Sequence, residues 1–110
     1  MALSPPEGSF LRNGYPPKIL RQLRRGDWRV EDELDLHGLN RVEAGPVISD
    51  FLVDATARRF RCVRIVHGKG TGVLRETLRA ALPERTEVLA FVEAPAAQGG
   101  SGAVLVLLKA

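Results

Sequence analysis

Two histidine–glycine pairs are the residues of this sequence best suited to chemistry. His37 is followed by Gly38, and His67 opens a His-Gly-Lys-Gly run that ends at Gly70. Imidazole titrates near neutral pH, so a pair of histidines can act as general base and general acid in phosphodiester cleavage. The catalytic residues predicted from these pairs are His37 and His67. The residue types therefore indicate a site that handles nucleic-acid phosphates.

Glycines beside the histidines are predicted to hold a phosphate. The His-Gly-Lys-Gly run leads into a predicted helix, whose free N–H groups and dipole favour an anion. Glycine lets a phosphate approach the backbone closely, and lysine adds a point charge. The run differs from the P-loop, which has more residues between its glycines and ends in Lys-Ser or Lys-Thr. The predicted phosphate-binding residues are Gly38, Gly68, Lys69, Gly70 and Gly100.

Asp35 is the third predicted catalytic residue. It precedes His37 by two positions, so on a strand both side chains project from one face. Its carboxylate could orient His37, orient His67 across the sheet, or help to bind a metal ion. A zinc site is not expected, because no cysteine or close second histidine completes a ligand set. The single cysteine, Cys62, excludes an intramolecular disulfide and is expected to be buried and inert.

Alternating strands and helices must position these residues. Strands are predicted near residues 34–37, 62–66, 88–92 and 104–108, with helices after Asn40 and across residues 74–82. This β-α-β-α-β-β order favours parallel pairing with right-handed crossovers, and the last strand is expected to run antiparallel. The predicted fold is an α/β two-layer sandwich with a mixed four-stranded sheet and two helices on one face. The carboxyl ends of three strands would then meet at one edge.

Local signals refine two of these connections. Asn40 and Glu43 have the spacing of a capping box, and Pro46 is expected either to start the regular helix or to kink its first turn. Gly99, Gly100 and Gly102 predict a loose loop before the last strand.

The first thirty residues are predicted to form a flexible tail and a short basic helix, preceding a domain over residues 31–110. Proline and glycine dominate residues 1–17, and a helix is expected from there to Arg25, ended by Gly26. Two hypotheses remain open for this partly ordered basic arm. It packs an apolar stripe on the domain, or it contacts nucleic acid through Lys18, Arg21, Arg24 and Arg25.

Composition limits the class of protein. The chain has 110 residues, a net charge of +3 and 45% hydrophobic residues, as expected for one globular domain. No stretch approaches the roughly 20 apolar residues of a membrane span, and the N-terminus lacks a secretory pattern. A cytoplasmic location without a membrane partner is therefore expected.

Three motifs resemble those of the Smr (small MutS-related) domain. They are Leu-Asp-Leu-His-Gly-Leu at 34–39, Val-Arg-Ile-Val-His-Gly-Lys-Gly-Thr-Gly-Val-Leu-Arg at 63–75, and Gly-Gly-Ser-Gly-Ala at 99–103. The resemblance covers about residues 31–109 and implies a two-layer α/β fold like the C-terminal domain of translation initiation factor three. It also implies nuclease activity on DNA or RNA, including messenger RNA on stalled ribosomes. Gly45-Pro46 departs from the family pattern by interrupting a helix.

The first functional hypothesis is an endonuclease whose partner is RNA or DNA, in the setting of the ribosome or elsewhere. With RNA, the 2′-hydroxyl is an internal nucleophile and no cofactor is required. With DNA, water attacks and a divalent cation such as Mg²⁺ or Mn²⁺ assists. The alternative is a non-catalytic module that binds nucleic acid or the ribosome, as some Smr domains do. An enzyme acting on a small phosphate compound is a third option.

Overall fold

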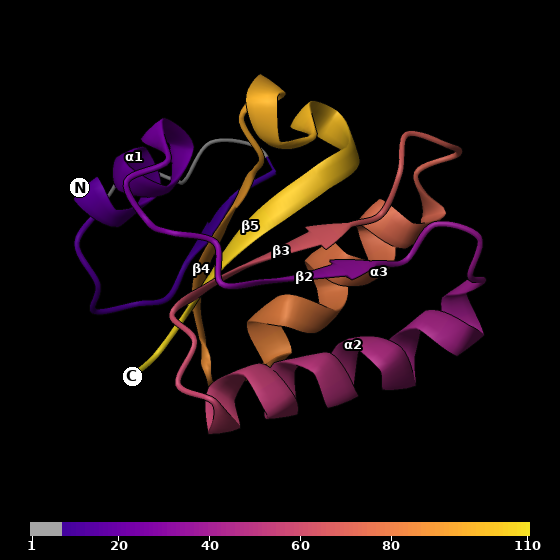
Figure 1. Cartoon of the computed structure of the whole chain (residues 1–110), viewed down its shortest axis with the longest axis horizontal. Helices are drawn as coiled ribbons and strands as arrows, with labels where there is room; N and C mark the ends of the chain where they lie inside the picture. The colour runs from indigo at the N-terminus through magenta and orange to yellow at the C-terminus, as the bar shows by residue number, and fades with distance from the viewer. Residues whose placement is uncertain (1–7) are drawn as a thin grey trace.

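The computed structural model describes residues 8–110, and the part of the predicted tail formed by residues 1–7 lies outside them. Within the described range, five strands form one mixed sheet in the order β1-β4-β5-β3-β2 (Figure 1). The strands are β1 (Phe10–Leu11), β2 (Asp32–Asp35), β3 (Cys62–Val66), β4 (Val88–Glu93) and β5 (Ala103–Leu108). The helices are α1 (Lys18–Arg25), α2 (Arg41–Ala57) and α3 (Val73–Ala81), with short 3₁₀ helices η1 (Leu82–Glu84), η2 (Ala96–Gln98) and η3 (Gly100–Gly102).

Strand direction confirms the predicted convergence of three carboxyl ends. β2 and β3 are parallel, and β5 runs antiparallel to both β3 and β4. β4 therefore points the same way as β2 and β3, although β5 separates it from them. The parallel pair is in register at Leu34 with Ile65 and at Asp35 with Val66.

The sheet has a packed core on each face. α2 and α3 cover one face, as predicted, and bury apolar side chains such as Leu52 and Leu78 against the sheet (Figure 1). α1 covers part of the opposite face, where Leu23 is fully buried with residues of β4 and β5. None of the helices among the described residues is long and apolar enough to cross a bilayer.

β1 corrects the predicted strand count from four to five. It lies in the segment expected to be a flexible tail, and its Phe10 pairs with Phe91 of β4, with the two rings 5.6 Å apart. Arg12 follows the strand and donates to the carbonyl oxygens of Pro83, Arg85 and Val88 at 2.8, 2.9 and 2.8 Å. These partners are far away in sequence, so no local pattern reveals the strand.

α1 and its ends follow the prediction. The helix covers Lys18–Arg25 and is followed by Gly26 in a left-handed conformation, with φ of 78°, which glycine adopts without steric cost. Its apolar residues Ile19, Leu20 and Leu23 are buried. The structure thus shows an apolar stripe packed on the domain, with the basic side chains directed outward.

α2 begins before Pro46, which excludes the expectation that this proline starts the helix. The capping box is present: Asn40 accepts from the Glu43 N–H at 2.8 Å, and Glu43 accepts from the Asn40 N–H at 2.9 Å. The helix starts at Arg41 and continues through Pro46, so this proline does not start it and Gly45-Pro46 does not interrupt it. The carbonyl left without an N–H donor belongs to Val42, which is 80% exposed and open to water.

Candidate functional site

The loops that follow β2 and β3 lie side by side. The Leu36 N–H donates to the Val66 carbonyl at 2.7 Å, which extends the parallel pairing one residue beyond β2. Continuing that register places His37 beside Gly68. A Cβ built on Gly68 would lie 3.6 Å from the His37 Cβ, so the two backbones approach closely. The structure therefore brings together the two predicted histidine–glycine motifs.

Asp35 contacts His37 and fixes its tautomer. The Asp35 carboxylate oxygen lies 2.8 Å from His37 Nδ1 and also accepts the His37 backbone N–H at 3.0 Å. A carboxylate only accepts, so Nδ1 carries a proton, and in the neutral ring Nε2 is then the acceptor. The backbone N–H of His37, followed by its ring, lowers the pKa of Asp35. Since the His37 side chain is 74% exposed, its Nε2 is open to a ligand.

His67 has a different environment from His37. It is only 6% exposed, and its Nδ1 donates to the Gly68 carbonyl at 2.8 Å. Burial lowers its pKa because the charged imidazolium loses hydration, and Arg75 acts in the same direction. The Gly68 carbonyl and Glu93 act in the opposite direction without reversing the shift. Burial therefore favours the neutral form of the His67 ring.

The loop before β5 holds the His-Gly-Lys-Gly run through backbone hydrogen bonds. The Gly102 carbonyl accepts from the N–H groups of both His67 and Gly68, each at 2.9 Å. The segment predicted as a loose loop is therefore ordered into η2 and η3. Gly100, a predicted phosphate ligand, donates its own N–H to the Pro95 carbonyl at 3.1 Å and does not line the cleft described next.

The two histidine loops enclose an open cleft of about 590 Å³. Five of the predicted site residues besides Gly68 line it: His37, Gly38, His67, Lys69 and Gly70. Asp35 contacts His37 but does not itself line the cleft. The first residue of α2 and the first three residues of α3 also line the cleft, and the dipole at a helix N-terminus favours an anion.

Two arginines outside the predicted set also line the cleft. Arg41 is the first residue of α2, and Arg75 is the third of α3. With Lys69 they supply three cationic side chains, and no carboxylate lies in the lining formed by described residues. A basic residue in the first helical turn after each motif was the signal available in the sequence. The cleft is therefore suited to phosphate groups.

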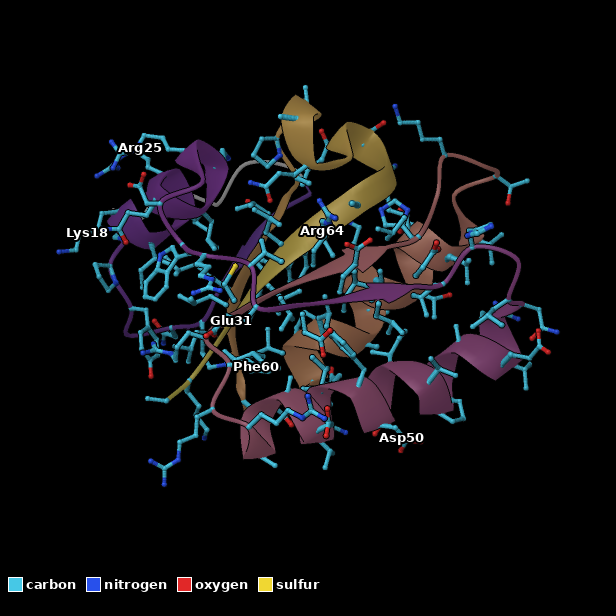
Figure 2. All side chains as sticks on the ribbon, in the orientation of Figure 1. Lys18, Arg25, Glu31, Asp50, Phe60 and Arg64 are labelled. Carbon is cyan, nitrogen blue, oxygen red and sulfur yellow. The ribbon has the colours of Figure 1, made fainter. Side chains whose placement is uncertain are left out.

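The four basic residues predicted on the arm are not part of this cleft. Lys18, Arg21, Arg24 and Arg25 belong to α1, at the opposite end of the long axis from the ends of β2 and β3 (Figure 2). Arg25 pairs with Asp27 at 2.7 Å. A ligand reaching both regions must extend along most of the molecule, whose longest dimension is 38 Å.

A metal site and a reactive thiol both lack support in the described part of the chain. No three histidine, cysteine, aspartate or glutamate side chains gather in residues 8–110 in a way that could hold a metal ion. Cys62 is fully buried on β3, as predicted, and burial raises the pKa of its thiol to about 11.

Comparison with known proteins gives a consistent result. The family model of the Smr domain matches residues 34–109. Ribosome rescue factor SmrB of Serratia proteamaculans (strain 568) is 33% identical over 100 residues, which cover 91% of this chain and 57% of that protein. The chain thus spans little more than half the length of this curated relative.

Two solved structures resemble the fold. The crystal structure of YdaL, a stand-alone small MutS-related protein from Escherichia coli, superposes with a TM-score of 0.84 and 30% identity, covering 94% of this chain and 83% of YdaL. The Smr domain of Thermus thermophilus MutS2 gives a TM-score of 0.70 and 39% identity, covering 72% of this chain and 99% of that domain.

Proposed function

The chain belongs to the Smr domain family, and on that premise we propose that it binds RNA associated with the ribosome and cleaves it in the cleft. The observation that carries the proposal is the cleft itself, which His37 lines together with Lys69, Arg41 and Arg75 and with no carboxylate among the described lining residues. The name of the SmrB relative supports a setting at the ribosome, and hence in the cytoplasm. It supports binding more directly than cleavage, so the two steps are tested separately.

Binding follows from the charges and the free backbone. Lysine and arginine neutralise phosphates and release counterions, which makes affinity depend strongly on salt. The glycines of the His-Gly-Lys-Gly run let a phosphate reach the backbone, and the first turn of α3 presents unpaired N–H groups. We expect Lys69→Gln to weaken RNA binding by about tenfold and to reduce its salt dependence by roughly one phosphate contact. Arg58→Gln, outside the cleft, is the matched control.

Cleavage follows from the orientation of His37. Because Asp35 holds the proton on Nδ1, Nε2 can accept the proton of a ribose 2′-hydroxyl. The 2′-oxygen then attacks the adjacent phosphorus, and the bond from phosphorus to the 5′-oxygen breaks. The products are a 2′,3′-cyclic phosphate and a 5′-hydroxyl, whose proton comes from solvent. This route needs no cofactor.

His67 receives a structural role in this proposal in place of the predicted acid role. A general acid must be protonated before it acts, and the burial that lowers the pKa of His67 disfavours its protonated form. Its buried ring, held on the Gly68 carbonyl, instead fixes the loop that carries Lys69.

The second candidate function is binding without cleavage. It is favoured by the names of the relatives, which refer to ribosome rescue, and by the single exposed histidine in the cleft. Wild type and His37→Ala should be compared for both binding and cleavage of one RNA. Equal binding with a loss of cleavage of about 10²–10⁴-fold in the variant supports the nuclease. Binding by both with cleavage by neither supports the binding module, and absence of binding by wild type contradicts both.

A further inference from the structure

A second, smaller cavity adjoins the cleft on the other side of His67. Its volume is about 260 Å³, and His67 and Arg75 line both cavities. Arg79, Glu93 and Ser101 are among the residues that line the second one only. An RNA strand with one nucleotide in the cleft can therefore place its next nucleotide in the second cavity.

One wall of this cavity is cationic. Arg75 and Arg79 are four residues apart on α3, so they project from the same side of the helix. The Glu76 carboxylate of the same helix lies near both guanidinium groups: 3.9 Å from Arg75 Nε and 3.2 Å from Arg79 Nη1. Glu76 is 66% exposed and does not line the cavity. Two positive charges share one negative charge, so the wall retains net positive charge.

The same cavity also offers hydrogen-bond acceptors. Glu93 ends β4, and Ser101 lies in η3. Glu93 also acts electrostatically on His67, which lines the same cavity. A carboxylate can accept from a sugar hydroxyl, and a serine hydroxyl can donate or accept. A pocket lined by both cations and hydrogen-bond acceptors matches a nucleotide better than a simple anion.

We propose that this cavity binds the nucleotide adjacent to the one in the cleft, with its phosphate on Arg75 and Arg79 and its sugar or base donors on Glu93. The proposal rests on the proposed binding of RNA in the cleft and extends it to a second subsite. Arg75 lies between the two subsites and contacts both. Glu76 competes with the phosphate for both arginines and so weakens binding.

The test measures binding of a short single-stranded RNA to the full chain by fluorescence anisotropy over a range of salt concentrations. Arg79→Gln is expected to weaken binding about five- to tenfold and to lower the salt slope by roughly 0.7, the value for one phosphate contact on a single strand. Arg58→Gln is the matched control, since Arg58, the residue that follows α2, also pairs with a helical carboxylate, Asp54 at 3.3 Å, and lines neither cavity. Glu76→Gln is expected to tighten binding about two- to fivefold, because it frees the phosphate-binding arginines.

The outcomes separate the two proposals. If wild type does not bind, or if Lys69→Gln binds as well as wild type, the proposed function fails. If Lys69→Gln weakens binding but Arg79→Gln matches Arg58→Gln in affinity and salt slope, the second subsite is overturned and the cleft stands. Arg79→Lys guards against a folding defect, since it keeps the charge and should retain the salt slope. Looser binding by Glu76→Gln would also contradict the proposal.

Discussion

Replacing Gly102 by alanine should impair RNA binding while leaving the fold nearly as stable as before. Its carbonyl holds the N–H groups of His67 and Gly68, and an added Cβ would lie 3.1 Å from Lys69 Cγ and 3.6 Å from Lys69 Cε. The nearest backbone atom, the Gly68 carbonyl carbon, would be 3.5 Å away, an ordinary contact. The new methyl group therefore acts mainly on the lysine side chain.

The expected cost in stability is small because Lys69 is exposed and flexible. Moving its stem away from a staggered rotamer costs about 0.5–1.5 kcal/mol. Replacing glycine with alanine at an unstrained position returns about 0.4–1 kcal/mol by restricting the unfolded chain. The net change in the free energy of unfolding should stay within about 1 kcal/mol. RNA affinity should fall several-fold, up to the loss seen with Lys69→Gln.

Gly99→Ala is the matched comparison in the same loop. Gly99 has a φ of 109°, and its added Cβ would lie 2.9 Å from the Ala103 Cβ, which β5 holds in place. Backbone strain alone costs about 1–3 kcal/mol, and the clash adds to it, so this variant should lose at least 2 kcal/mol, or roughly 10 °C of Tm. Urea unfolding and anisotropy on both variants measure stability and affinity. Equal destabilisation by the two, or unchanged RNA affinity in Gly102→Ala, would refute the argument.

Three further predictions concern single residues. Asp35→Asn should retain RNA binding but lower cleavage at least tenfold, because the tautomer of His37 is no longer fixed; unchanged cleavage contradicts this. The folded-state pKa of His67 lies below its ordinary value of 6.5, so the unfolded chain binds the proton more readily. The free energy of unfolding should therefore be full above about pH 6.5 and fall as the pH drops from there toward the lower folded-state pKa. Urea midpoints should show this dependence, and His67→Gln should reduce it. Asn40→Ala should cost about 0.5–2 kcal/mol of unfolding free energy by removing the capping box, with equal urea midpoints as the contrary result.

Local sequence patterns predict the elements whose own residues show strand periodicity or helix-capping motifs. β3 occupies the predicted residues 62–66, and Gly26 and the Asn40–Glu43 pair end and begin helices as expected. β1 has no local signal, because two residues show no periodicity and Phe10 pairs with Phe91, 81 positions further along the chain. The ordering of the glycine loop into η2 and η3 likewise depends on contacts that no local pattern shows.

The site could be predicted in part for the same reason. Parallel pairing of β2 and β3 was enough to place His37 beside Gly68. The unequal burial of the two histidines depends on the loop before β5, whose Gly102 closes against His67. The contribution of Arg75 depends on how α3 is rotated on the sheet, and that rotation is set by packing.

The central claim is that His37 activates a ribose 2′-hydroxyl in the cleft. The most direct test incubates wild type and His37→Ala, in EDTA, with an RNA and with the same RNA carrying 2′-O-methyl groups, and identifies the product ends. Cleavage of the unmodified RNA by wild type to 2′,3′-cyclic phosphate ends is expected, with none for the methylated RNA although it still binds. Cleavage of the methylated RNA, or equal cleavage by His37→Ala, would contradict the account.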